Sequence, residues 1–98
     1  MFTGLVQAVG TVVHTREGPG GVRRIAVDTG AWAHRPSPGD SIAVDGCCLT
    51  VVGEPEESVL SFDAIPQTLA LTTLGSLRAG DRVNLEHAAT PSTLLGGH

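Results

Sequence analysis

One short stretch of the chain places reactive side chains at a regular spacing. In residues 45–51, read Asp-Gly-Cys-Cys-Leu-Thr-Val, the residues after Gly46 have the alternating character of a strand. A glycine inside such a run indicates a bulge or a sharp bend, where a ligand or another backbone can come close. Alternation then puts Cys48 and Thr50 on one face, about 6–7 Å apart at the usual strand rise. That face would offer a thiol beside a hydroxyl.

The same stretch also has a plain structural interpretation. Free cysteines are among the most often buried residues, so Cys47 and Cys48 could be small core residues and Thr50 an ordinary strand residue. The spacing alone favours this interpretation. Adjacent cysteines do not make a disulfide framework, and they lack the ligand spacing of a zinc site. Two free thiols indicate a reducing, cytoplasmic setting.

The four histidines form no recognisable motif. His14, His34 and His87 are scattered along the chain, and we expect each to be a solvated surface residue. His98 follows two glycines at the last position, where it could reach back over a neighbouring element or fray. The sequence has no Gly-x-Ser-x-Gly, His-Glu-x-x-His or Walker motif. The residues by themselves therefore predict no complete catalytic constellation.

The elements that must position these residues are short strands. Clusters of glycine and proline separate β-branched runs, a pattern typical of an antiparallel sandwich or barrel. We expect six strands, at residues 9–14, 22–27, 41–44, 47–52, 59–63 and 82–86. We expect two short helices, at residues 31–34 and 66–71, the first ending before Pro36 and the second beginning with a proline. Residues 18–21 (Gly-Pro-Gly-Gly) are predicted to form a hairpin tip.

Composition excludes several classes of protein. Hydrophobic residues make up 41% and charged residues 16%, which indicates a domain with one core, not a disordered tail. The net charge is −4 and every basic residue is arginine, which argues against nucleic-acid binding through a basic face. No apolar run approaches the ~20 residues of a membrane span, and no signal peptide is visible. With three aromatic residues, the chain would hold a planar ligand without an aromatic cage.

Several segments match one protein family in order and in spacing. They are residues 1–7 (MFTGLVQ), 39–51 (GDSIAVDGCCLTV), 62–63 (FD), 66–69 (PQTL), 72–75 (TTLG), 80–86 (GDRVNLE) and 96–98 (GGH). Together they resemble riboflavin synthase of the alpha-chain, lumazine-binding type. The resemblance spans the whole chain, and agreement of so many segments in register makes a chance match very unusual.

The resemblance implies a fold and a ligand. The fold is an all-β, six-stranded antiparallel Greek-key barrel with one or two short helices, and residues 1–98 would form a single such barrel. Family members carry two barrels in a chain about twice as long, so we expect the second barrel to be absent here. The implied ligand is 6,7-dimethyl-8-ribityllumazine or the product riboflavin, with no metal or external cofactor required.

The resemblance also implies roles for particular residues. The family reaction is a dismutation, in which one lumazine transfers a four-carbon unit to a second. Its proton handling would fall to Ser41, Cys48 and His98. The ligand pocket would draw on Gly4, Leu5, Val6, Thr50, Asp63, Ala64, Ile65 and Thr68. Thr50, Thr68 and the backbone of residues 64–65 would bond the pyrimidine edge or the ribityl chain, and Asp63 would accept from ribityl hydroxyls.

Three functions remain open at this point. The barrel could bind or carry a flavin or lumazine as a homodimer, because the absent partner barrel would leave an apolar face uncovered. It could instead be a catalytically active homodimer that faces two lumazines, or a barrel retained for protein contacts alone. We expect no nucleic-acid or membrane partner. We also expect riboflavin or lumazine to be preferred over phosphorylated cofactors, since no basic phosphate cradle is evident.

Overall fold

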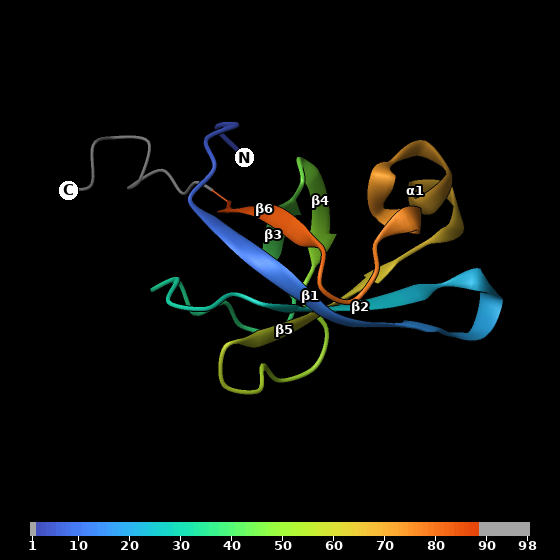
Figure 1. The fold of residues 1–98 in the computed structure, drawn as a ribbon, viewed down its shortest axis with the longest axis horizontal. Coiled ribbons are helices and arrows are strands. Elements are labelled where there is room, and N and C mark those ends of the chain that lie inside the picture. Colours follow the sequence, from blue (N-terminus) through green and yellow to red (C-terminus); the bar gives the residue numbers. More distant parts are fainter. Residues whose placement is uncertain (1, 89–98) are drawn as a thin grey trace.

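The computed structural model describes residues 2–88 and shows one antiparallel sheet that curls into a nearly closed barrel (Figure 1). The six strands are β1 (Ala8–Glu17), β2 (Arg23–Asp28), β3 (Ser41–Val44), β4 (Cys47–Thr50), β5 (Val59–Ala64) and β6 (Arg82–His87). Their order in the sheet is β4-β3-β6-β1-β2-β5. The last strand thus lies between the first and third, as in a Greek key. The predicted fold class is confirmed.

The predicted strands are all present, and most boundaries agree within two residues. β1 is the exception, because it continues to Glu17 after a bulge between Val12 and His14. Beyond the bulge it forms a ribbon with β2, which extends to one side of the barrel in Figure 1. The ribbon ends in the 3-10 turn η1 (Pro19–Gly21), so the predicted hairpin tip is also confirmed.

One of the two predicted helices is correct. Helix α1 (Pro66–Leu71) begins at its proline as expected and is followed by a 3-10 turn, η2 (Thr73–Ser76). The helix predicted at residues 31–34 is wrong. There the chain makes a turn, in which Trp32 N donates to Thr29 O at 3.2 Å, and then runs on without regular structure. Too few residues separate this turn from Pro36 for a helix to form. Across residues 2–88, no helix is long and apolar enough to cross a membrane.

The core fills the barrel with side chains from alternate strand positions. Phe62, Ile25 and Ile42 are completely buried at its centre. Leu74 and Leu77, which follow α1, are buried in the same cluster. The segment between β5 and β6 is therefore anchored in the barrel by two leucines, although it belongs to no strand.

At Gly10 the packed core leaves no room for a side chain. A Cβ atom at this position would lie 2.6 Å from Val27 Cγ1 and 2.9 Å from Leu85 Cδ1. We predict that Gly10→Ala lowers the free energy of unfolding by about 1–3 kcal/mol, because a packed core resists added volume. Urea denaturation measures the change. Gly18→Ala is the control, since its Cβ would meet only Val22 O at 3.4 Å, and its effect should stay within about 0.5 kcal/mol. Equal effects of the two substitutions would contradict this packing.

Candidate ligand-binding site

Strands β4 and β5 meet at one point and then separate. The bridge between Val51 and Phe62 is isolated. The backbone hydrogen bond beside it runs from Val52 N to Ser61 O, 2.9 Å. Among the described residues, β4 and β5 form no continuous ladder of hydrogen bonds. The barrel is therefore left open along the rest of β4.

The register of the bridge shows what faces this opening. If this register continued toward the start of β4, Thr50 would lie opposite Asp63 and Cys48 opposite Ile65. Strand alternation would put these four side chains on the outer face of the sheet. Their neighbours in the two strands are inside the barrel: Leu49 and Ala64 are buried. The opening is thus bordered by a thiol, a hydroxyl, a carboxylate and an aliphatic side chain.

Backbone groups of β4 also face the opening. Val51 N donates to Asp40 O, 2.9 Å, on the β3 side of the strand. In an antiparallel strand, successive peptide groups point to opposite sides. The N–H and C=O groups of Cys48 and Thr50 therefore point toward β5. Cys48 has no β5 partner among the described residues, which leaves a short length of unpaired sheet edge.

A cavity of about 550 Å³ continues this opening toward α1 and η2. On one side it is lined by residues of the β3–β4 turn and β4, and on the other by the end of α1 and the start of η2. The lining residues are Asp45, Gly46, Cys47, Cys48, Leu71, Thr72, Thr73 and Leu74. This volume is within the range of sites that bind drug-sized molecules. We take the opening and this cavity together as the candidate site.

The two cysteines differ in their surroundings. Cys48 is exposed on the same face as Thr50, as the alternation predicted, so its interpretation as a core residue is wrong. Cys47 is half-buried and packs against the core. Burial raises the pKa of the Cys47 thiol, and the neighbouring Cys48 raises it further. Both thiols border the cavity, and Cys48 is the more exposed of the two.

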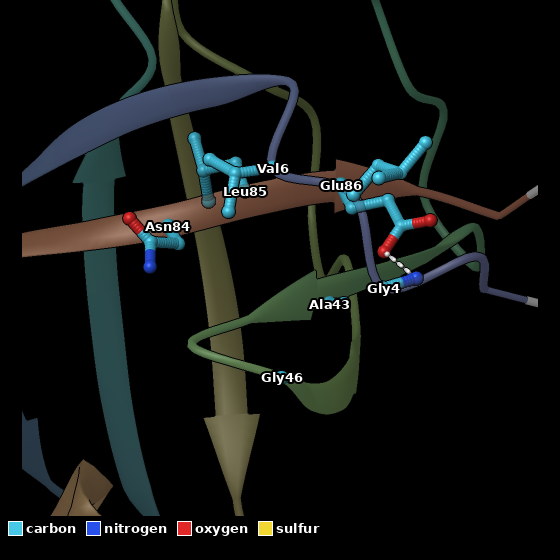
Figure 2. A pocket seen from close by; sticks show the side chains of 8 residues that line it. Gly4, Val6, Ala43, Gly46, Asn84, Leu85 and Glu86 are labelled. Carbon is cyan, nitrogen blue, oxygen red and sulfur yellow. Dashed lines mark hydrogen bonds between the residues drawn. The ribbon is translucent and has the colours of Figure 1, made fainter.

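The N-terminal segment borders a second, smaller hollow of about 190 Å³ (Figure 2). Gly4, Leu5 and Val6 form one side of it, over β3 and β6. Gly46 lines this hollow as well as the candidate site, so the two meet at the β3–β4 turn. The N-terminal residues expected at a ligand therefore lie next to the candidate site and not inside it.

The buried carboxylate of Glu86 ties this segment to β6. It accepts from Thr3 N at 2.5 Å, from Thr3 Oγ1 at 2.6 Å and from Gly4 N at 3.1 Å, the last shown in Figure 2. The Thr3 hydroxyl is the main cause that lowers the pKa of Glu86, with the two backbone amides adding to it and burial opposing it. An ionised Glu86 thus holds the start of the chain in place.

Ser41 lies in a third hollow, of about 280 Å³, beside His34 and His87. The two imidazole rings stack with their centroids 4.3 Å apart, and Trp32 packs against both. Burial, followed by the proximity of His87, lowers the pKa of His34. The prediction of scattered, solvated histidines is wrong for this pair, because the fold brings the end of β6 against the loop after β2. His14 is exposed as expected.

Asp63 is already engaged by a charged partner. Arg24 on the neighbouring strand donates to it through Nε at 2.7 Å and through Nη2 at 2.9 Å. The hydrogen bond from Arg24 is the main cause that lowers the pKa of the Asp63 carboxyl. The carboxylate therefore lies at the edge of the opening as half of an ion pair, and not as a free acceptor.

The remaining predicted residues occupy different positions. Ala64 is buried, Ile65 is exposed at the end of β5, and Thr68 is half-buried on α1, where its carbonyl accepts from the Thr72 hydroxyl at 2.7 Å. His98 lies outside the described residues. Among residues 2–88, no group of His, Cys, Asp and Glu is arranged to hold a metal ion.

The sequence did not indicate the far wall of the site. Residues 71–74 line the cavity. The sequence marked this segment only through the match of residues 72–75 to the family pattern, which did not place it at the ligand. Their place opposite Cys48 depends on the path of the chain after β5, which no local pattern reveals.

Comparisons with known proteins agree with this geometry. A family model described as the lumazine binding domain matches residues 3–88. The riboflavin synthase of Chlamydia pneumoniae is 42% identical over 98 residues, which cover 100% of this chain and 48% of that protein. The riboflavin synthase of Escherichia coli strain K12 is 40% identical, with 100% and 46% covered. The chain spans about half the length of the curated relatives it matches.

Solved structures show the same arrangement of strands. LumP complexed with flavin mononucleotide has a TM-score of 0.79 at 30% identity, covering 95% of this chain and 50% of that one. LumP complexed with riboflavin has a TM-score of 0.79 at 28% identity, covering 93% and 50%.

The Glu86 contacts predict a pH dependence of stability. The pKa of folded Glu86 lies below the unfolded value of about 4.3, so the contacts contribute fully above that pH. Their contribution is lost as the pH falls through the folded value. The unfolding free energies of the wild type and Glu86→Gln should therefore differ most near neutral pH, and the difference should shrink as the pH falls below the unfolded pKa and through the folded one. Glu54→Gln, on an exposed loop, should match the wild type throughout. A Glu86→Gln difference that is constant with pH would contradict this role.

Proposed function

The chain belongs to the lumazine binding domain family, and we propose that its barrel binds one molecule of 6,7-dimethyl-8-ribityllumazine or riboflavin between β4 and the α1–η2 segment. The observation that carries the proposal is the unpaired edge of β4 beside a cavity of about 550 Å³. Riboflavin synthases at about 40% identity and LumP complexes with riboflavin support it.

The edge of β4 suits the chemistry of these ligands. A flavin or lumazine ring is planar, and its pyrimidine edge alternates carbonyl and N–H groups. The N–H and C=O of Cys48 and the N–H of Thr50 offer complementary donors and an acceptor at strand spacing, whereas the bridge to Phe62 engages the Thr50 carbonyl. The ring would thus take the place of the missing β5 ladder and satisfy backbone groups that otherwise bond only to water. No aromatic cage is needed for this mode of binding.

The ribityl chain requires polar partners, because unpaired buried hydroxyls cost about 1–3 kcal/mol each. Thr50 carries a hydroxyl at the opening, and Thr72 and Thr73 carry hydroxyls on the opposite wall. We propose that the hydroxyl of Thr68, on α1, adds to them. Asp63 would contribute while still bonded to Arg24. Our preference for the unphosphorylated ligand stays a prediction.

Catalysis by this chain would require two ligands to face each other in unequal roles. The chain spans about half of the riboflavin synthases it resembles, so we propose that one barrel supplies one half of such a site. Of the expected proton-handling residues, Cys48 lies at the candidate site and Ser41 in a separate hollow. Cys48 is therefore our first candidate for a reacting side chain, and its exposed thiol is consistent with the cytoplasmic location that we propose.

A second copy of the chain is the partner that we propose for the barrel. Leu5 and Leu71 are 69% and 78% exposed. Leu5 lines the N-terminal hollow and Leu71 the candidate site, on either side of the β3–β4 turn. A homodimer would cover both leucines and shield the bound ligands from water.

Ligand binding is tested by titrating riboflavin and following its fluorescence. We predict quenching at micromolar concentration, and a dissociation constant raised about threefold to tenfold by Thr50→Val, which removes a hydroxyl but keeps the shape. Thr11→Val, on the exposed face of β1, is the matched control and should bind as the wild type does. Absence of quenching by the wild type would refute the proposed function, and an unchanged Thr50→Val would refute this placement of the ligand.

Sedimentation velocity tests the proposed dimer. We predict a species of twice the chain mass, which Leu5→Ser shifts toward monomer because it removes apolar area from the interface. Val13→Ser, which changes an exposed residue of β1 away from the turn, should leave the dimer intact. A monomeric wild type with riboflavin bound would show that one barrel suffices for binding.

A further inference from the structure

The far wall of the candidate site is not part of the sheet. Helix α1 and turn η2 lie between β5 and β6, and Thr72, Thr73 and Leu74 of this segment line the cavity. Helix α1 and turn η2 pack tightly against each other, since a Cβ at Gly75 of η2 would lie 3.1 Å from the carbonyl oxygen of Leu69 in α1. The segment therefore behaves as one unit, and whatever holds it to the barrel sets the width of the site.

Two leucines give this unit an apolar anchor. Leu74 is fully buried and Leu77 is 7% exposed, both in the barrel core. Apolar contacts are not directional, so they hold the segment against the core without fixing its orientation. A directional contact is needed to set the wall at a defined distance from β4.

Arg23, at the start of β2, provides that contact. Its Nη1 donates to Gly75 O, and its Nη2 donates to Leu77 O at 2.9 Å. The same Nη2 donates to Thr15 Oγ1 at 3.0 Å, which steadies the guanidinium on β1. The side chain is only 17% exposed, and the carboxylate of Glu17 is the nearest acidic group, 3.9 Å from Nε.

The acceptors explain why an arginine suits this position. Gly75 and Leu77 lie at the C-terminal end of η2, where helical carbonyls lack partners in the helix and carry partial negative charge. A guanidinium is a planar fork with several donors, so it reaches two carbonyls and a hydroxyl at once. A lysine offers one point charge on a flexible stem and would reach fewer of them.

We propose that Arg23 is a positioning residue of the ligand site, which fixes the α1–η2 wall opposite Cys48 without lining the cavity itself. The inference rests on the proposed function. Without the guanidinium, the wall would hold to the barrel through the apolar contacts of Leu69, Leu74 and Leu77 alone, which do not fix its orientation. A ligand would then have to order the wall as it binds, and its apparent affinity would fall.

The test compares riboflavin binding by the wild type, Arg23→Met and Arg23→Lys. We expect Arg23→Met to raise the dissociation constant about tenfold, and Arg23→Lys to restore part of the affinity. Arg82→Met is the matched control, because Arg82 is exposed on β6 and its side chain makes no hydrogen bond or ion pair with the described residues. Its affinity should equal that of the wild type.

Two further measurements separate positioning from general stability. In the ligand-free protein, Arg23→Met should speed amide hydrogen exchange in residues 66–77 and leave β4 unchanged. The rise in Tm on adding riboflavin should also be smaller in Arg23→Met than in the wild type. If Arg23→Met does not fold, Arg23→Lys and Thr15→Val replace it in both measurements, because each removes part of the hydrogen bonding of the Arg23 guanidinium.

The outcomes are distinct. Wild-type affinity in the folded Arg23 and Thr15 variants would overturn the inference, as would unchanged exchange in residues 66–77. Failure of the wild type to bind riboflavin would overturn the proposed function instead.

Discussion

Incomplete pairing between β4 and β5 is the constraint on which the rest of the molecule depends. A closed barrel has no free sheet edge, whereas here the ladder stops at a single bridge between Val51 and Phe62. The backbone of Cys48 is left unpaired beside a cavity, and we propose that a planar ligand with its own donors and acceptors completes the sheet there. The chain thus keeps one packed core, and the groups that we propose to bind the ligand lie where the core ends.

Two charged side chains hold the segments on either side of the β3–β4 turn. Glu86 binds the amides of Thr3 and Gly4, and Arg23 binds the carbonyls of Gly75 and Leu77. Neither segment belongs to a strand, so neither is placed by the sheet. Opposite charges suit the two tasks, because a carboxylate accepts from amide N–H groups and a guanidinium donates to carbonyls. The binding that we propose at the β4 edge uses backbone groups and needs no aromatic cage, so three aromatic residues in the chain suffice.

The strands and the hairpin tip could be predicted from the sequence because their signals are local. Alternation in residues 41–44 and 47–52 predicted strands β3 and β4 and placed Cys48 and Thr50 on one face. The spacing favoured a buried Cys48, however, and the exposure of this face could not be predicted from it. The stacking of His34 on His87 could not be predicted, since it depends on contacts between residues far apart in sequence. The Arg24–Asp63 pair and the wall at residues 71–74 were missed for the same reason.

The most direct test of this account is a riboflavin titration followed residue by residue through backbone amide chemical shifts. The account predicts that the largest changes fall on Cys48 and Thr50 of β4 and on Thr72 and Thr73 of the opposite wall. Changes centred instead on His34 and His87, or spread evenly over the barrel, would contradict a ligand that completes the open edge of the sheet.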